Sequence, residues 1–243
     1  MEFAAEPLAE DALLLRFGER IDVALNAKVH AAANALRAAN LPGIQDIAPA
    51  YASLLLRFDP FHWHDRQDPG ALPHTRVSEA VHKILAPANA AGRDTLAPNR
   101  TSRIIEFPVC YGSTYGVDLE EIAAHARMTP DEVVARHSAQ DYTVAMLGFA
   151  PGFPYLLGLD PVLHTPRRAT PRTRVPAGSV AIGGAQTGIY PRELPGGWNL
   201  IGRTPLMLFD PRRSAPSLLA PGDHVHFRAI TAAEFTALAG HAA

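Results

Sequence analysis

Apolar positions in the first third of the chain follow two different periods. The run ALLLRF at 12–17 is almost wholly apolar and ends at Gly18, which predicts a short buried strand. From Asp22 to Asn40 the apolar residues recur at helical spacing, and Leu41-Pro42-Gly43 then breaks the pattern. The positions expected on the buried face of this helix are Leu25, Val29, Ala32 and Leu36.

Two further strands are predicted at Ile44–Ala50 and Ser53–Phe58, and a fourth at Ile104–Val109. Between them, Ser78 is the predicted N-cap of a second helix, with Val81, Ile84 and Leu85 facing inward. The resulting β-α-β-β-α-β order is typical of a ferredoxin-like unit. ALLLRF and SLLLRF would then be its two central strands, because buried strands are continuously apolar.

The middle of the chain is predicted to be helical. Asp118 with Glu121 fits a capping box, and so does Thr129 with Glu132, where Pro130 would occupy the first helical position. A strand is expected over Tyr142–Phe149.

From Gly148 onward, proline and glycine punctuate short apolar runs, which favours an all-β barrel or sandwich. The predicted strands are Ser179–Ile182, Leu206–Phe209 and His224–Phe227. The fold class expected is therefore α+β. A small N-terminal ferredoxin-like α/β domain covers 1–110, and a C-terminal β domain, a barrel or a sandwich, covers 111–243.

Composition narrows the function classes. The formal net charge of the 243 residues is -2, so no general attraction to nucleic acid or to an anionic membrane is expected. No apolar run has the length of a membrane span, and no secretory signal is visible, so we expect a cytoplasmic protein. Lysine occurs only at Lys28 and Lys83, and there is no P-loop or dinucleotide-binding glycine motif.

The stretch Gly148–Pro205 carries the candidate chemistry. It combines turn residues with aromatic side chains and many arginines, against only Asp160 and Glu193 as acids. Rigid loops of this kind suit a pocket for a small anionic or amide-bearing molecule. Gln186-Thr187-Gly188 could also present an oxyanion-hole type of donor set. The alternative is that proline and glycine only make barrel turns and the arginines form a solvated face.

Other candidates are weaker. His62 with His64, and His224 with His226, would each place two imidazoles on one face of a strand, but no cluster completes a metal site and surface histidines are favoured. His137 and Ser138 resemble a nucleophile with its base, but adjacent residues on a helix do not face each other, so a structural role at the end of the predicted helix is expected. Cys110, the single cysteine, is expected to be a buried thiol.

Four long motifs resemble one family. They are GFAPGFPYL, TPRRATPRTRVPAGSVAI, GGAQTGIYP and PGGWNLIGRTPLMLFDP, in that order, preceded by FGERI and FPVCYG. The family is variously called the 5-oxoprolinase B subunit, allophanate hydrolase subunit 1 and kinase A inhibitor. The resemblance implies a C-terminal cyclophilin-like β-barrel. It also implies a homologous partner, the 5-oxoprolinase C subunit or allophanate hydrolase subunit 2, and a further partner, the 5-oxoprolinase A subunit.

The activity that the resemblance implies is conversion of 5-oxoproline to glutamate by the complex, with hydrolysis of ATP (with Mg²⁺) to ADP and phosphate. This chain alone is expected to be inactive. Two alternatives remain: an inhibitor of a histidine kinase, and a carboxyltransferase component of a urea carboxylase or allophanate pathway. No catalytic residue is assigned. The residues predicted to bind substrate are Phe153, Tyr155, Arg172, Arg174, Gln186, Tyr190, Trp198 and Arg203.

Overall fold

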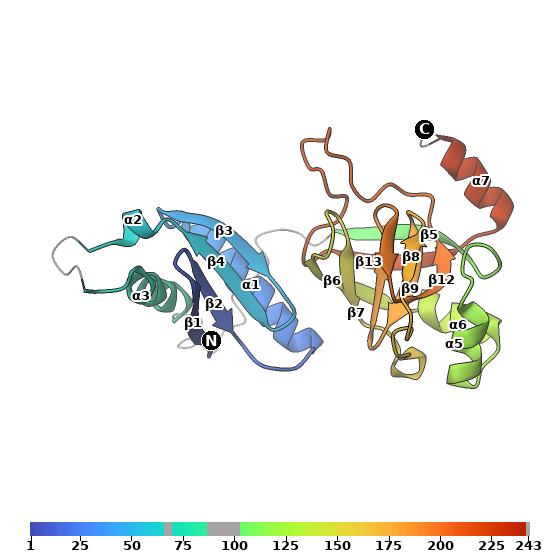
Figure 1. Ribbon diagram of the computed structural model, residues 1–243, viewed down its shortest axis with the longest axis horizontal. Helices are drawn as coiled ribbons and strands as arrows, with labels where there is room; N and C mark the ends of the chain where they lie inside the picture. The colour runs from blue at the N-terminus through green and yellow to red at the C-terminus, as the bar shows by residue number, and fades with distance from the viewer. Residues whose placement is uncertain (66–69, 87–102, 242–243) are drawn as a thin grey trace. The chain divides into compact units, whose positions relative to one another are not determined.

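The computed structural model describes residues 1–65, 70–86 and 103–241, and it divides into two compact units, Met1–Ser102 and Arg103–Ala243 (Figure 1). The division falls before strand β5 (Ile104–Tyr111) and not after it, because β5 is hydrogen-bonded into the sheet of the second unit.

The first unit is a four-stranded antiparallel sheet with helices packed against one face (Figure 1). Its strands lie in the order β1-β2-β4-β3. They are β1 (Ala4–Ala9), β2 (Ala12–Arg16), β3 (Ile44–Pro49) and β4 (Ser53–Phe58). The helices are α1 (Val23–Ala39), α2 (Pro60–Trp63) and α3 (Pro73–Leu85).

The two leucine-rich runs are the central strands, as predicted. Leu13 lies opposite Leu56 and Leu15 opposite Leu54, and all four are buried in the core that the strands share with helices α1 and α3. Alternation along each strand sends these leucines to the helical face, so this pair of strands anchors the core of the unit.

The ferredoxin-like order is not confirmed. In a ferredoxin-like sheet the last strand, Ile104–Val109, would pair with β2, but β1 pairs with β2 there instead. The sequence pattern missed β1 because most of its residues are exposed. The second helix begins at Pro73, so the prediction of Ser78 as its N-cap is wrong. Proline at the first helical position lacks only an N–H that the helix would leave unpaired.

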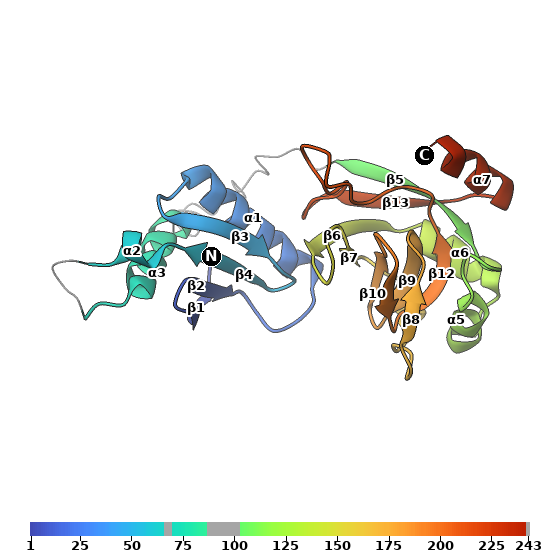
Figure 2. The same ribbon diagram turned by 45° about the horizontal axis from the view of Figure 1, so that its top comes forward.

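The second unit contains a closed seven-stranded barrel, in the order β10-β7-β6-β13-β5-β12-β9 (Figure 2). Its other strands are β6 (Asp141–Leu147), β7 (Pro154–Leu157), β9 (Ser179–Gly183), β10 (Gln186–Ile189), β12 (Asn199–Arg203) and β13 (His224–Ala229). Strands β5 and β13 pair in parallel, although more than a hundred residues separate them. A barrel is therefore confirmed, with its first strand supplied by the predicted end of the N-terminal domain.

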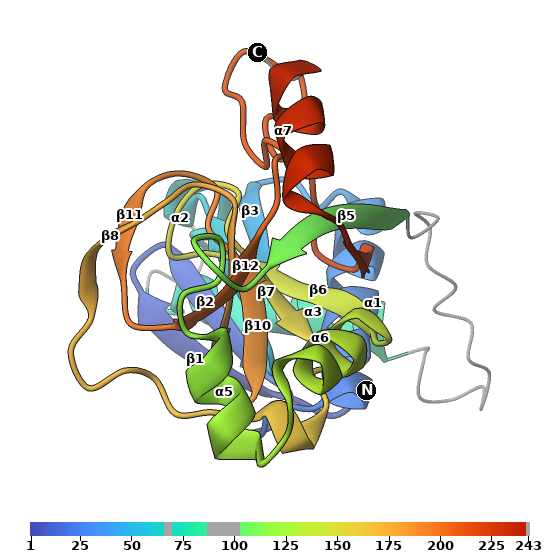
Figure 3. The same ribbon diagram turned by 90° about the vertical axis from the view of Figure 1, so that its right-hand side faces the viewer.

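Outside the barrel strands, β8 (Arg172–Val175) and β11 (Leu194–Gly196) pair as a separate two-stranded ribbon to one side of the barrel (Figure 3). The helical elements are α5 (Leu119–Ala126), α6 (Pro130–Ser138), the short 3₁₀ helix η1 (Pro161–Leu163) and α7 (Ala232–His241). The predicted strand at Leu206–Phe209 is wrong, since only Phe209 forms an isolated bridge there.

The two predicted capping boxes have different outcomes. Thr129 caps α6 reciprocally with Glu132, as predicted. Asp118 precedes α5 but makes no side-chain cap, so that prediction is wrong. None of the helices in the described ranges has the length and apolar character that crossing a bilayer requires.

Candidate functional site

A pocket of about 330 Å³ lies in the second unit, between the ends of barrel strands and the β8–β11 ribbon. Four segments of the Gly148–Pro205 stretch form it: the chain from Phe149 into β7, the loop before β8, Tyr190 just after β10, and the chain from β11 to the residue before β12. We call it the aromatic pocket. Its lining residues are Phe149, Phe153, Tyr155, Arg167, Arg168, Pro171, Tyr190, Pro195, Gly196, Gly197 and Trp198.

Phe153 is the centre of the aromatic wall. Its ring centroid lies 5.0 Å from that of Tyr155, 5.2 Å from Tyr190 and 5.7 Å from Trp198. The contacts with Tyr190 and Trp198 are edge-to-face, the geometry in which aromatic pairs add stability beyond burial. Phe153, Tyr190 and Trp198 are buried, so the wall is fixed before any ligand arrives.

Two glycines make room for these rings. A Cβ on Gly183 would lie 2.6 Å from ring carbons of Trp198, and one on Gly196 would lie 2.1 Å from the Tyr190 hydroxyl. Neither distance is possible for a real side chain, so the glycines of GGAQTG and PGGW are required by close approach of the rings.

The loop that carries Phe149 has a strained backbone. Phe149 has φ +66°, and the Ala150 N–H donates to the Gly148 carbonyl at 2.7 Å, which closes a tight γ-turn around it. The next turn, Ala150 to Phe153, places Pro151 and then Gly152 (φ +79°) at its centre, as a type II turn requires. Phe149 is 59% exposed beside the pocket, so a strained residue holds an aromatic ring at its mouth.

The charged groups that line the aromatic pocket are both cationic. The Cζ atom of Arg167 lies 5.6 Å from the Trp198 ring centroid, and no carboxylate forms an ion pair with Arg167 in the described part of the chain. Arg168 instead donates to Asp118 at 3.0 Å and to Glu121 at 3.2 Å. Arg167 is therefore the cation available to an anionic ligand.

Two tyrosine hydroxyls complete the lining. Burial raises the pKa of Tyr190, opposed by a backbone hydrogen bond from Trp198. Burial also raises the pKa of Tyr155, opposed by the charge of Arg167. Both phenols therefore stay protonated at neutral pH.

The predicted substrate-binding residues separate into two groups. Phe153, Tyr155, Tyr190 and Trp198 line the aromatic pocket together. The remaining four predicted residues, Arg172, Arg174, Gln186 and Arg203, are not among its lining residues. The structure also places Phe149, Arg167 and Arg168 in the lining, which belong to the same motifs but were not among the residues predicted to bind substrate.

Each of the three predicted arginines has another partner. Arg172 is bound through both terminal nitrogens to Asp118, at 2.7 and 2.9 Å. Arg174 is 78% exposed and pairs with Glu193 next to the ribbon, and Arg203 donates to the Ala177 carbonyl at 2.7 Å. Sequence alone offers no way to choose among the arginines, because their partners lie far apart in the chain.

The Gln186-Thr187-Gly188 segment does not form a donor set at the pocket. Thr187 is fully buried in β10 and its hydroxyl donates to the Ala181 carbonyl at 3.1 Å. Because that proton is used, the Thr187 oxygen accepts from Nε2–H of His137 at 3.0 Å, and His137 Nδ1 accepts from the Tyr111 hydroxyl at 2.8 Å. Burial lowers the pKa of His137 to about 3. The predicted structural role of His137 is thus supported by two hydrogen bonds inside the barrel.

The remaining sequence candidates do not form a site. His62 lies in the short helix α2, so it does not share a strand face with His64. His224 and His226 both lie in β13 and, two residues apart, share one face of that strand. Among the described residues no group of three or more His, Cys, Asp or Glu side chains is arranged to hold a metal. Cys110 is buried in β5, as predicted, and burial raises the pKa of its thiol.

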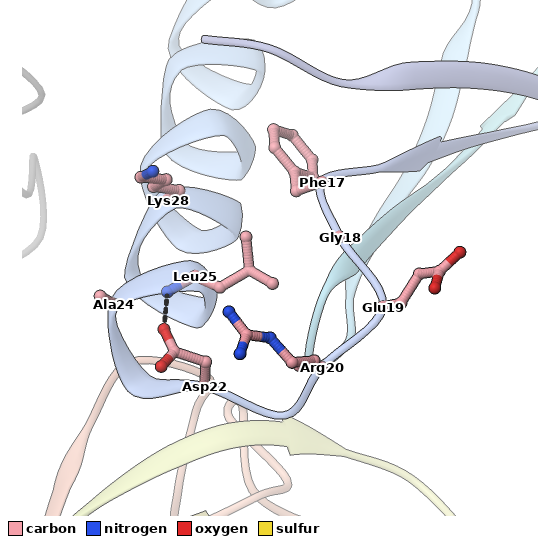
Figure 4. A pocket seen from close by; sticks show the side chains of 8 residues that line it. All are labelled: Phe17, Gly18, Glu19, Arg20, Asp22, Ala24, Leu25 and Lys28. Atoms are coloured by element: carbon pink, nitrogen blue, oxygen red, sulfur yellow. Dashed lines mark hydrogen bonds between the residues drawn. The ribbon is translucent and has the colours of Figure 1, made fainter.

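A second pocket, of about 280 Å³, lies in the first unit around the FGERI motif (Figure 4). Its walls are the Phe17–Asp22 loop and the first turns of α1, with both Arg20 and Glu19 on the loop. The Asp22 carboxylate already accepts from the Leu25 N–H at 2.8 Å, so part of the helix N-terminus is occupied by the protein itself. This hollow has mixed charge and a single aromatic side chain, Phe17, so the aromatic pocket is the better candidate site.

Comparison with known proteins identifies the family. Residues 3–219 match the family model for the carboxyltransferase domain, subdomains C and D. The chain is 41% identical over 238 residues to the 5-oxoprolinase B subunit of Bacillus subtilis, covering 98% of this chain and 97% of that protein.

Two solved structures have the same fold. The protein TTHA0988 is 38% identical with a TM-score of 0.74; the match covers 90% of this chain but only 40% of that longer chain. The urea carboxylase of Kluyveromyces lactis, at 19% identity and TM-score 0.73, covers 99% of this chain and 23% of its own, and shows the fold alone. On the family match and the full-length relative together, this chain belongs to the carboxyltransferase-domain (subdomain C and D) family that includes the 5-oxoprolinase B subunits.

Proposed function

We propose that this chain is the B-type component of an ATP-dependent 5-oxoprolinase, which converts 5-oxoproline to glutamate in the cytoplasm. Its proposed partners are the homologous C-type component and the A-type component of that complex. The observation that carries the proposal is Arg167, which lies above an aromatic wall and has no carboxylate partner among the described residues. The proposal is also supported by the Bacillus subtilis relative, which matches this chain over nearly its whole length and is named as a 5-oxoprolinase B subunit.

The chemistry of 5-oxoproline suits this pocket. The molecule is a small flat lactam that carries one carboxylate, and a pocket of about 330 Å³ is at the lower end of ligand-site volumes. Arg167 can bind the carboxylate through two parallel N–H bonds. Trp198 and Phe153 supply apolar ring atoms to the lining, and the protonated Tyr190 hydroxyl can donate to the lactam carbonyl.

The residues of this pocket do not fit ATP with Mg²⁺. The lining residues named above include no carboxylate, and both oxygens of the nearby Asp118 already accept protein N–H groups. Magnesium sites next to phosphates use carboxylate ligands. We therefore propose that ATP binds on another component of the complex and that this chain contributes to binding of the amide substrate.

The test is reconstitution. The chain is purified with its C-type and A-type partners, and glutamate formed from 5-oxoproline and ATP is measured. We expect turnover by the complete complex and none by this chain alone. An assembled complex that hydrolyses no 5-oxoproline would rule the proposal out.

The carboxyltransferase alternative is favoured by the family description itself. It predicts transfer of carboxylate from a biotin carrier on another chain to urea, which is measured with labelled bicarbonate. The kinase-inhibitor alternative needs only an exposed surface. Capture of a histidine kinase by this chain, without any 5-oxoproline turnover by the complex, would support it instead.

A further inference from the structure

Asp118 is a buried carboxylate, only 3% exposed, at the position where the sequence predicts a helix cap. Its side chain makes no cap on α5 and accepts four hydrogen bonds from other N–H groups. Oδ1 accepts from Arg168 at 3.0 Å and from Arg172 at 2.7 Å. Oδ2 accepts from Arg172 at 2.9 Å and from the Leu200 backbone at 2.7 Å.

These contacts saturate the carboxylate. An ionised carboxylate has about four acceptor positions, and each of them has a donor here. Asp118 also donates its own backbone N–H to the Leu200 carbonyl at 2.9 Å. One residue therefore ties together three segments: the start of α5, the chain from Arg168 into β8, and β12.

The two arginines at Asp118 carry one more charge than Asp118 itself can neutralise, and Glu121 supplies the second negative charge. Arg168 and Arg172 face the single buried charge of Asp118, and Glu121, whose side chain is 65% exposed, provides the other acceptor for Arg168. Because Glu121 is in water, its attraction for Arg168 is screened, and Asp118 provides the firmer hold.

Arg168 connects this cluster with the aromatic pocket, since it lines the pocket and is anchored by Asp118. Arg172, the first residue of β8, fixes the ribbon whose partner strand supplies Gly196. We propose that Asp118 is the positioning residue of the aromatic pocket, holding Arg168 and the β8–β11 ribbon in the arrangement that binds an anionic substrate. This inference rests on the proposed function for the identity of the substrate, 5-oxoproline.

The first arm of the test needs no substrate. The full chain is labelled with ¹⁵N-arginine, and the guanidinium signals of Arg168 are identified by their loss in Arg168→Gln. We expect separate Nη signals in the parent protein, because Asp118 restricts rotation, and averaged signals in Asp118→Asn. Arg168 signals that are the same in both proteins would overturn the proposal.

The matched control is Asp223→Asn. Asp223 is also buried, at 1% exposure, and accepts from Arg103 and from the Ala220 N–H, but neither partner lines the pocket. It reproduces the loss of a buried carboxylate without touching Arg168, so it should leave the Arg168 signals unchanged. If Asp118→Asn does not fold, Asp118→Asn with Arg172→Met removes one charge of each sign, and Arg168 is still observed.

The second arm measures the KM for 5-oxoproline in the reconstituted complex. We expect Asp118→Asn and Arg168→Gln each to raise KM by about tenfold. The double variant should be no worse than Asp118→Asn alone, because Asp118→Asn already removes the hydrogen bond that holds Arg168. Additive effects would show that Asp118 does not act through Arg168. If the unmodified complex has no 5-oxoproline turnover, the proposed function fails, and the guanidinium signals alone decide the role of Asp118.

Discussion

The guanidinium carbon of Arg167 lies 5.6 Å from the centre of the Trp198 ring, over a buried indole whose close approach Gly183 permits. Arg167 forms no ion pair with a carboxylate of the described residues, whereas the adjacent Arg168 is held by Asp118 and Glu121. Two consecutive arginines thus have different roles: one is anchored in the protein, and the other is available to a ligand.

Replacement of Arg167 by glutamine should raise the KM for 5-oxoproline by about tenfold or more, because a charged hydrogen-bonding partner of the substrate is lost. Stability should change by less than about 0.5 kcal/mol, since Arg167 is exposed. The matched control is Arg192→Gln, which removes the same charge from an exposed residue outside the pocket lining. Equal effects of the two variants on KM would contradict a specific role for Arg167.

Substitution of Gly183 by alanine should displace the Trp198 indole. The added Cβ would meet ring carbons at 2.6 Å, and overpacking of a fixed core costs about 1–3 kcal/mol. Urea unfolding measures the loss, and a shift in tryptophan emission reports the displaced ring. Gly240→Ala is the control, because a Cβ at Gly240 meets nothing within 4 Å. A Gly183→Ala protein with unchanged stability and emission would show that the ring is not confined.

The backbone strain at Phe149 can be measured by comparing the stabilities of two variants. Glycine tolerates φ +66° and alanine does not, so Phe149→Gly should be more stable than Phe149→Ala by about 1 kcal/mol, although both lose the ring. Denaturant midpoints of the two variants give the difference. An alanine variant as stable as the glycine variant would show that the turn relaxes in solution.

His137 should make stability depend on pH. Its pKa is lowered to about 3 in the fold, against about 6.5 in the unfolded chain, so below pH 6.5 only the unfolded state takes up the proton. The contribution of neutral His137 is therefore complete above pH 6.5 and is lost as pH falls toward 3. When the pH falls from 7 to 5, loss of this contribution should lower the free energy of unfolding by about 2 kcal/mol.

The comparison with His137→Gln isolates this contribution, because the other titrating groups remain. The glutamine variant should lack this difference of about 2 kcal/mol, while the exposed His125→Gln should retain it. Parallel pH profiles for the parent protein and His137→Gln would contradict the burial of a neutral imidazole.

Local patterns were sufficient for several elements. The apolar runs at 12–17 and 53–58 predicted the two central strands of the first unit, and the spacing of Thr129 and Glu132 predicted the cap of α6. The aromatic residues and turn residues of Gly148–Pro205 predicted a pocket there, and the four predicted aromatic residues do line one pocket together: Phe153, Tyr155, Tyr190 and Trp198. In each case the deciding interaction is either near in sequence or a matter of residue type.

Only the tertiary structure decided the rest. The apolar pattern of strand β5 would suit the sheet of the first unit as well as the barrel. It joins the barrel because it pairs with β13, which lies more than a hundred residues further along the chain. Asp118 looks like a helix cap, but arginines 50 and 54 residues away take its oxygens. The sequence by itself therefore determined which residue types gather around the pocket. Long-range pairing of charges and strands decided which arginine is anchored and which is available, because local sequence does not encode a partner that folding brings from elsewhere.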